Sequence, residues 1–381
     1  MTLKTYKKIL LIGIAVLIIL FCLFGESNYK IPVYTMLIFG IIVIISLVLT
    51  LIANSDDIQP REKWNKNIIK YKSIDSDFDK IYSSIYNENI KKIRKYKNKS
   101  MVTEVIFKIL FFILFNFHFV YFMLSMIYDE NFFASLLLKS NNILVFIVEM
   151  VILSFAYEKA YKYREIYVNI YKEKVIKKLI EAIDKNLIYQ NTDNNNLEKY
   201  FKEADFYKTS DSAFFSNDYI NGNVNGINIQ ISDAKLGKDQ LKISYKGLFS
   251  FCKINKKIPF EIRITNNKIE SMVKGSKVNL DSLEFEKYFD VFCEYNIFAV
   301  RLLTHDVMEE MIAFYEKIGL DFEIVIREDN IYIKFDVQDV FEPEVFRNTM
   351  NKNTLWIFYS IIKFAVTFTQ KMNKILDEFD V

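Results

Sequence analysis

The sequence predicts an α+β protein in which N-terminal transmembrane α-helical hairpins precede a cytoplasmic domain built on an antiparallel sheet with packed helices. Three observations support this fold class. Four long apolar stretches lie before residue 158. Apolar residues recur at helical spacing between and after these stretches. From residue 197 onward they alternate with polar residues, as they do in half-buried strands.

The first two apolar stretches predict a membrane hairpin over residues 1–53. Ile9–Phe24 follows a basic N-terminus, and Pro32–Ala53 contains no charged residue. At 1.5 Å per helical residue the second stretch would extend about 33 Å, which is enough to cross a bilayer. The first stretch alternatively resembles a signal peptide. Because no A-x-A-like cleavage site follows it, a retained hairpin is the preferred interpretation.

Residues 54–104 predict a cytoplasmic helical loop of two short helices. Trp64 and Ile68, and later Phe78 and Ile81, recur at helical spacing, and Asp75 between them can cap the second helix. The loop ends in the lysine-rich run 90–99. This run is either the ordinary basic flank of the next span or a surface that captures anionic headgroups.

A second membrane hairpin is predicted over residues 105–157. Its spans are Val105–Tyr128 and the shorter Asn142–Tyr157, joined by an acidic loop. Lysine and arginine precede the first span and follow the second and fourth. By the positive-inside rule we expect a multi-pass protein of the cell inner (plasma) membrane with both termini in the cytoplasm.

Polar residues inside a membrane are functional candidates because their burial in hydrocarbon is costly. Here they are Lys108, Asn116, His118 and Glu149. Lys108 and Glu149 lie at similar predicted depths, so we expect them to pair and lock the second hairpin. Alternatively, His118 and Glu149 line a proton or ion path, which would make the chain a component of a transporter or channel that uses spans three and four.

The remaining residues predict a juxtamembrane helix and linker (158–196) followed by the cytoplasmic α+β domain (197–381). The helix runs through Leu187 to a polar break at 190–196. In the domain, Asn225-Gly226 between alternating stretches is a strong hairpin signal, because both residues tolerate positive φ. A strand is expected at Tyr288–Tyr295.

The C-terminal part predicts a helix, a hairpin and a second helix. Thr304 and Gly319 mark the ends of the first helix. Phe322–Phe335 reads as a hairpin that turns at Asp329-Asn330. The last helix, 353–379, contains an apolar stretch that suggests a fifth span, but a polar stripe that includes Lys363 favours a core helix packed on the sheet.

Three motifs in this domain resemble the sequences of a known protein family. They are YINGNVNGINIQISDAKL (219–236), YKGLFSF (245–251) and FEKYFDVFCEYNIFAVRLLTHDVMEEM (285–311). Together they make residues 160–381 similar to the bacterial membrane-protein family catalogued as domain of unknown function 3137. The resemblance implies membrane spans before a cytoplasmic α+β domain and no known activity. The second membrane hairpin departs from the single hairpin that is commoner in this family. In the third motif, Phe285, Phe289 and Leu302 read as core residues.

The charge distribution and the motifs of the chain reduce the number of function classes that we expect. Residues 1–190 hold 26 of the 50 Lys and Arg residues but 17 of the 47 Asp and Glu residues, so the distal half is mildly acidic. Nucleic acid is therefore not an expected partner. His305 and Asp306, with Cys293, form the one constellation that a nucleophilic enzyme could use, and exposed first-turn residues explain it better. The carboxylates Asp281, Glu284 and Glu286 lack metal-loop spacing.

We therefore expect no enzyme, no cofactor, and no catalytic or metal site. The expected function is a membrane-anchored cytoplasmic binding or scaffolding module, with the transporter or channel component as the alternative. Its partners would be the lipid bilayer and a membrane or cytoplasmic protein. The sequence leaves the ligand and the oligomeric state open.

Overall fold

The computed structural model describes residues 75–128, 140–192, 196–207, 213–237, 243–266, 273–337, 341–343, 345–346 and 350–378, without the side chains of 116–146, 196 and 243–244. The first predicted membrane hairpin, residues 1–53, lies outside the described residues. The described elements, in chain order, are α3 (Ser76–Tyr128), α5 (Ser140–Tyr171), the π-helix η2 (Lys172–Ile176), α6 (Lys177–Ile183), β1 (Leu187–Gln190), α7 (Asn196–Glu203), β2 (Ala213–Val224), β3 (Ile227–Gly237), β4 (Ile243–Thr265), β5 (Ser276–Lys277), α8 (Leu283–Glu286), β6 (Asp290–Cys293), α9 (Asn296–Leu302), α10 (His305–Ile318), β7 (Phe322–Phe335) and α11 (Lys352–Glu378).

The chain divides into two compact units. In the first, which includes residues 94–128 and 140–167, α3 and α5 run antiparallel: the rings of Phe107 and Tyr157 lie 5.5 Å apart, and Lys99 Nζ lies 5.4 Å from the ring centre of Tyr163. Among the residues that the structure describes, none of the helices combines the length and apolar character needed to cross a membrane.

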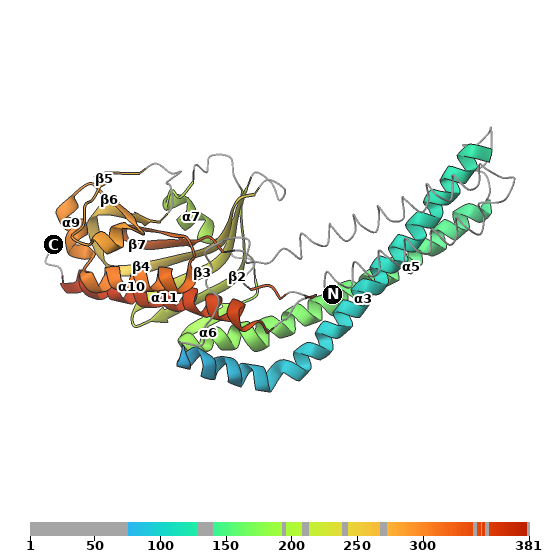
Figure 1. Cartoon of the computed structure of the whole chain (residues 1–381), viewed down its shortest axis with the longest axis horizontal. Helices are drawn as coiled ribbons and strands as arrows, with labels where there is room; N and C mark the ends of the chain where they lie inside the picture. The colour runs from blue at the N-terminus through green and yellow to red at the C-terminus, as the bar shows by residue number, and fades with distance from the viewer. Residues whose placement is uncertain are drawn as a thin grey trace. The chain divides into compact units, whose positions relative to one another are not determined.

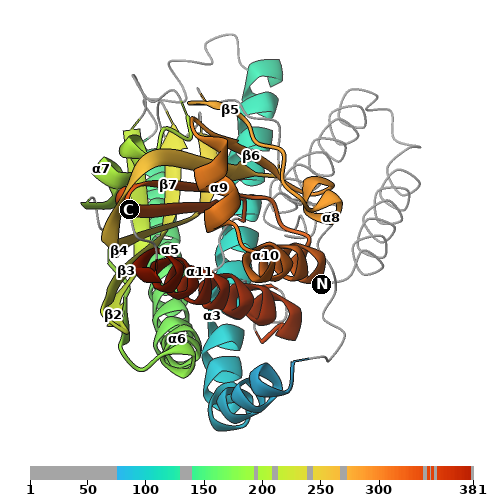
Figure 2. The same ribbon diagram turned by 90° about the vertical axis from the view of Figure 1, so that its left-hand side faces the viewer.

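The second unit is an antiparallel sheet covered by helices, which confirms the α+β prediction for the distal domain. The strand order is β1-β2-β3-β4-β6-β5, and β7 pairs with β4. Figure 1 and Figure 2 show α10 and α11 on one face of this sheet and α7 on the other. All the strand pairs are antiparallel.

The predicted hairpin at Asn225-Gly226 is confirmed as the turn between β2 and β3. Both residues have positive φ, +52° and +86°, and the backbone N–H of Gly226 donates to the side-chain oxygen of Asn223 at 2.9 Å. Asn225 is one of the few non-glycine residues that tolerate this conformation. The two-residue turn sets the register, so Val224 faces Ile227 at the first rung of the ladder.

The predicted hairpin within Phe322–Phe335 is wrong, because these residues form one continuous strand that pairs with β4 along its whole length. Phe322, Ile324 and Ile326 occupy even positions, whereas Ile331, Ile333 and Phe335 occupy odd positions. The change of phase comes from an irregularity in the pairing with β4, where Glu328 has a φ of +52°. A bulge shifts the alternation of side chains, so that odd positions take over the face that even positions had occupied, without reversing the direction of the chain.

Two predicted helix boundaries also differ from the structure. The juxtamembrane helix ends at Ile183, and Leu187 begins the edge strand β1. On the N-terminal side, α3 continues from the predicted loop helix through the predicted third span without a break, since residues 76–128 contain neither glycine nor proline. Its start is as predicted: the Asp75 carboxylate accepts a hydrogen bond from the N–H of Phe78 at 3.1 Å.

Helices α10 and α11 build the core on one face of the sheet. As predicted, α10 follows Thr304 and ends at Gly319, which has a φ of +65°. The last helix is also a core helix, as predicted, because α11 buries most of Leu355–Phe368. Phe314 of α10 and Phe364 of α11 stack with ring centres 4.1 Å apart. The motif residues Phe285, Phe289, Val291, Ala299, Leu302 and Leu303 are buried, as expected.

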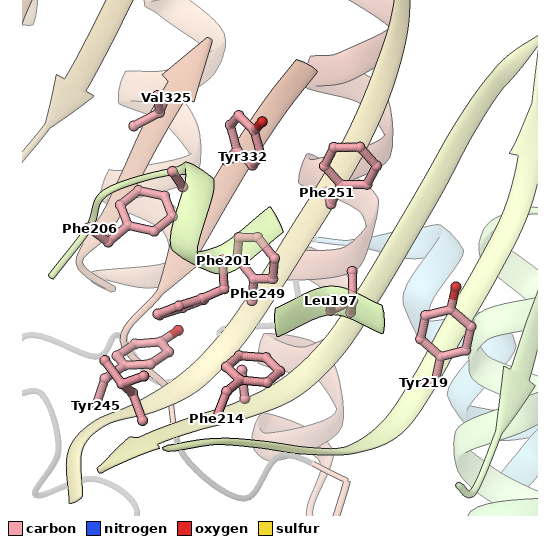
Figure 3. Close-up of a cluster of buried hydrophobic side chains, with 13 residues drawn as sticks. Leu197, Phe201, Phe206, Phe214, Tyr219, Tyr245, Phe249, Phe251, Val325 and Tyr332 are labelled. Carbon is pink, nitrogen blue, oxygen red and sulfur yellow. The ribbon is translucent and has the colours of Figure 1, made fainter. Parts of the chain in front are cut away.

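The opposite face carries an aromatic cluster beneath α7, shown in Figure 3. Phe201 of α7 lies between side chains of β2 and β4, with its ring centre 5.3 Å from that of Phe214 and 5.1 Å from that of Phe249. Tyr200 stacks on Phe251 at 3.6 Å. This short helix therefore seals the sheet face through its rings.

Candidate functional site

The four intramembrane candidates all map to α3 and α5. Lys108 Nζ lies 2.7 Å from Oε1 of Glu104, one turn earlier on α3. Glu149 lies on α5 and is half-buried, and Asn116 and His118 lie on α3 with side chains outside the described ones. The structure gives Lys108 a partner that the sequence analysis did not consider, and the pairing of Lys108 with Glu149 stays a prediction.

The residues His305 and Cys293 have separate environments. The exposed His305 Nε2 lies 3.0 Å from Oε1 of Glu309 on α10. Cys293 is buried in β6, where its thiol donates to the carbonyl of Tyr295 at 3.4 Å. Burial raises the pKa of this thiol, so Cys293 is mainly protonated at neutral pH.

An open groove of about 730 Å³ lies between the N-terminal part of α3, α6 and β1. Its polar lining consists of four lysines and two glutamates: Lys80, Lys177, Lys178, Lys185, Glu88 and Glu181. Its apolar lining includes Ile81, Ile85, Leu187 and Ile188. The volume falls within the range of about 300–1,000 Å³ that is typical of small-molecule sites.

Two ion pairs hold part of this lysine set in place. Lys178 Nζ donates to Glu88 Oε1 at 2.6 Å and so joins α6 to α3. That hydrogen bond lowers the pKa of Glu88. Lys177 pairs with Glu173, one turn earlier, at 3.5 Å. The α3–α6 pair therefore connects two of the elements that line the groove.

A buried ion cluster lies beside the groove and shares Tyr189 with it. Lys172, the first residue of η2, donates from Nζ to Asp218 Oδ2 at 2.8 Å, to Glu342 Oε1 at 2.5 Å and to Asn191 Oδ1 at 3.1 Å. The Tyr189 hydroxyl donates to the other oxygen of Asp218. All three protons of the ammonium group thus have an acceptor.

Asp218 occupies this position because β2 carries a bulge. Asn217 pairs with Asp233 and Tyr219 with Ser232, which leaves Asp218 as the extra residue, with a φ of +58°. A bulge re-aims the side chain of its extra residue. The aspartate is fully buried, and a left-handed conformation is strained for it unless its surroundings enforce it.

Burial and charge together set the protonation of the cluster. Burial lowers the pKa of Lys172, but the carboxylates of Asp218 and Glu342 outweigh it, so this pKa lies above its usual value. Burial raises the pKa of Asp218, and Lys172 and Tyr189 oppose the rise. Burial and the Asp218 carboxylate also raise the pKa of Tyr189. At neutral pH Lys172 is a cation, and Tyr189 is a neutral donor.

This cluster supports the groove structurally and does not offer a reactive group to solvent. Lys172, Tyr189 and Asp218 are all buried, whereas Glu342 is partly exposed and the amide of Asn191 is exposed. The hydrogen bond from Tyr189 to Asp218 holds the tyrosine that lines the groove. The cluster therefore links η2, β1, β2 and residue 342 at one end of the groove.

A second buried charge cluster clamps the segment after α7 onto the sheet. Arg263, fully buried, donates to Glu323 Oε1 at 2.7 Å and to the carbonyl of Ala204 at 2.9 Å. Lys334 Nζ lies 3.4 Å from the other oxygen of Glu323 and donates to the hydroxyl of Tyr207 at 3.1 Å. These contacts explain why the charged side chains of Arg263, Glu323 and Lys334 can lie on a buried face of the sheet.

Sequence reasoning missed both clusters and the groove. A signal existed for Lys172, which lies four residues before Ile176 and eight before Ile180, on the apolar stripe of the predicted helix. A cation on such a stripe is informative because lysine is seldom buried without a partner. Likewise, Arg263 lies between Ile262 and Ile264. The groove had no such signal, because it forms only when α3, α6 and β1 come together.

Comparisons with known proteins agree with the resemblance noted above. Residues 243–374, from β4 into α11, match the model of a family described as "Protein of unknown function (DUF3137)". This match includes the second and third motifs and not the first. No curated protein matches the chain. The crystal structure of the mycobacterial trehalose monomycolate transport factor A, TtfA, is 9% identical, covers 50% of this chain and 86% of that chain, and has a TM-score of 0.31, too low to bear on function.

Proposed function

We propose that the chain is an integral protein of the inner membrane that holds its α+β unit in the cytoplasm as a binding module. The observation that carries this proposal is the apolar surface of the first unit. Large apolar side chains of α3 and α5 are between 40% and 67% exposed: Val102, Val105, Ile106, Ile109, Phe111, Ile113, Phe115, Ile147, Val148, Met150, Val151, Ile152 and Phe155.

The size of this surface argues for a nonpolar environment. Burial of a fully exposed side chain of this kind contributes about 1.5–3 kcal/mol, and burial of the exposed half contributes about half of that. Soluble monomers rarely expose contiguous apolar patches larger than a few hundred Å². The sequence supplies further apolar length on both sides of these residues, up to Tyr128 on α3 and back to Asn142 on α5. A bilayer covers such a surface without a protein partner.

The binding role is supported by the groove of the second unit. Its volume suits a small ligand, its lining combines lysines with aliphatic side chains, and a buried ion cluster fixes one end of it. The lysine-rich run 90–99 within α3 and the basic residues Lys159, Lys162 and Arg164 within α5 support the cytoplasmic placement of this unit, because such segments remain on the cytoplasmic side.

The test combines membrane extraction with the accessibility of single cysteines. The full chain, with Cys22→Ala, is given one reporter: Lys287→Cys in the α+β unit or Asn131→Cys in the predicted external loop. We expect the chain to stay in the membrane pellet after alkaline carbonate washing. An impermeant maleimide should label the Asn131→Cys reporter in intact spheroplasts and the Lys287→Cys reporter only after lysis.

One control applies to the labelling and one to the carbonate wash. The Cys22→Ala chain without a reporter measures the background from the buried Cys252 and Cys293. A known peripheral protein must leave the membrane in the carbonate wash. Release of the chain by carbonate would contradict the anchor, and labelling of Lys287→Cys in intact spheroplasts would contradict the cytoplasmic placement.

A further inference from the structure

The lysines of the groove leave positive charge unmatched on both of its sides. Within the described residues, neither Lys80 on α3 nor Lys185 after α6 forms an ion pair, and both are exposed. Lys178 is bound by Glu88, as described above. With Glu181 as the only other carboxylate among the lining residues, the groove attracts an anion.

The floor of the same groove is apolar. Ile85 and Leu187 are buried there, whereas Ile188 on the edge strand β1 is 55% exposed. An apolar occupant that covers Ile188 removes apolar area from water, which favours binding. The lining is thus complementary to a molecule with one charged end and one apolar end.

The groove volume of about 730 Å³ is large enough for a small amphiphile. A phosphate group with a short alkyl chain fits. Lysine ammonium groups are also regular ligands of phosphate, which they bind as point charges.

We propose that this groove binds a phosphate-bearing amphiphile, with the phosphate on Lys80 and Lys185 and the alkyl part on Ile188. The inference rests on the proposed binding role and specifies the ligand class. A membrane phospholipid and a soluble alkyl phosphate share this chemistry. Both require the lysines and the apolar floor together.

The experiment uses the full chain in phosphatidylcholine nanodiscs, with empty discs as the blank. Hexyl phosphate, inorganic phosphate and hexanol are titrated by calorimetry. We expect saturable binding of hexyl phosphate and binding of the other two weaker by about tenfold or more. The Lys80→Gln/Lys185→Gln variant should bind hexyl phosphate about thirtyfold more weakly, because it removes two cations that contribute about 1 kcal/mol each. Ile188→Ser should weaken it severalfold.

The matched control is Lys287→Gln/Lys374→Gln, which removes the same charge from two exposed lysines outside the groove. It should leave binding unchanged. Equal affinity for inorganic and hexyl phosphate, or equal loss in both double variants, would overturn the proposal. Carbonate extraction of the same variants reports the anchor separately, so failure of the ligand and failure of the anchor are distinguishable.

A last arm identifies the source of the ligand. Discs that contain the anionic lipid phosphatidylglycerol are compared with discs of phosphatidylcholine alone, in which the choline cation balances the charge of the phosphate. If the groove takes a bilayer lipid, phosphatidylglycerol competes and weakens hexyl phosphate binding in the native chain. If it takes a soluble phosphate, hexyl phosphate binds equally in both discs and still depends on Lys80 and Lys185.

Discussion

Asp218 Oδ2 lies 2.8 Å from Lys172 Nζ, and both side chains are closed off from solvent. The pair joins a strained residue of a strand bulge to the first residue of a π-helix. π-Helical turns and strained backbone both occur frequently at functional sites. Here they come together beside the groove and hold its end.

Removal of the Lys172 cation should destabilise the second unit strongly. In Lys172→Met the carboxylate of Asp218 stays buried without its main partner, and breaking such a pair costs about 3–5 kcal/mol. The measurement is denaturant unfolding of the full chain in detergent, followed by the fluorescence of the buried Trp356. The exposed Lys185→Met is the control and should change little.

A double-mutant cycle isolates the pair from other effects of the substitution. Lys172→Met/Asp218→Asn removes both charges, so its loss of stability should be smaller than the sum of the two single losses. Strictly additive losses would mean that the two residues do not interact energetically, against the geometry described above.

The buried thiol of Cys252 should make the domain less stable at alkaline pH. Burial raises its pKa from an ordinary value of 9.0 to about 11. Because the folded pKa is the higher one, its contribution is fully present below pH 9 and is lost as the pH rises toward 11. The native chain should lose about 3 kcal/mol more than Cys252→Ala over this interval. Parallel curves for the two chains would refute this assignment.

Glycine at position 328 should be tolerated or stabilising. Glu328 has a φ of +52°, a conformation that costs most L-residues about 1–2 kcal/mol. Its ion pair with Lys257 spans 3.7 Å between exposed side chains and contributes little. We expect Glu328→Gly to raise the free energy of unfolding by up to about 1 kcal/mol.

The neighbouring Asn330→Gly is the matched control, because it lies in the same strand without a positive φ. It should lower stability by about 0.5–1 kcal/mol, since glycine is unfavourable inside a strand. If both glycines destabilise alike, the backbone at 328 is not strained.

The stability of the second buried charge cluster, which holds the segment after α7 on the sheet, should depend on the guanidinium of Arg263. Arg263→Leu leaves Glu323 buried beside a single cation, Lys334, and removes the bond to the carbonyl of Ala204. We expect a loss of about 3–5 kcal/mol in unfolding experiments. The exposed Arg301→Leu is the control. A loss below about 1 kcal/mol would show that the clamp is not needed to hold α7 on the sheet.

The fold class of the distal domain could be predicted because local signals and long-range structure agree there. Asn225-Gly226 specifies its turn by backbone conformation alone, and Thr304 and Gly319 mark both ends of a helix. The burial of α11 followed from its stripe of polar residues. These features depend on residues close in sequence.

The failures share one physical origin, which is pairing between distant segments. A change of phase between Ile326 and Ile331 fits either a turn or a bulge, and only the register with β4 decides between them. Leu187 continues a helical pattern, yet it pairs with Gly222 as part of β1. The groove and its lysines were beyond prediction for the same reason.

Of the described elements, α11 is synthesised last, and this order determines which surface the growing chain exposes. Its residue Thr369 donates to Cys252 of β4, yet α11 is made well after β4. At translation rates of about 5–20 residues per second, the ribosome needs roughly 4–17 s to travel from the end of β4 to the start of α11. During that interval the apolar face of the sheet has no cover from this helix. The nascent chain therefore presents a binding surface for chaperones that the finished protein no longer has.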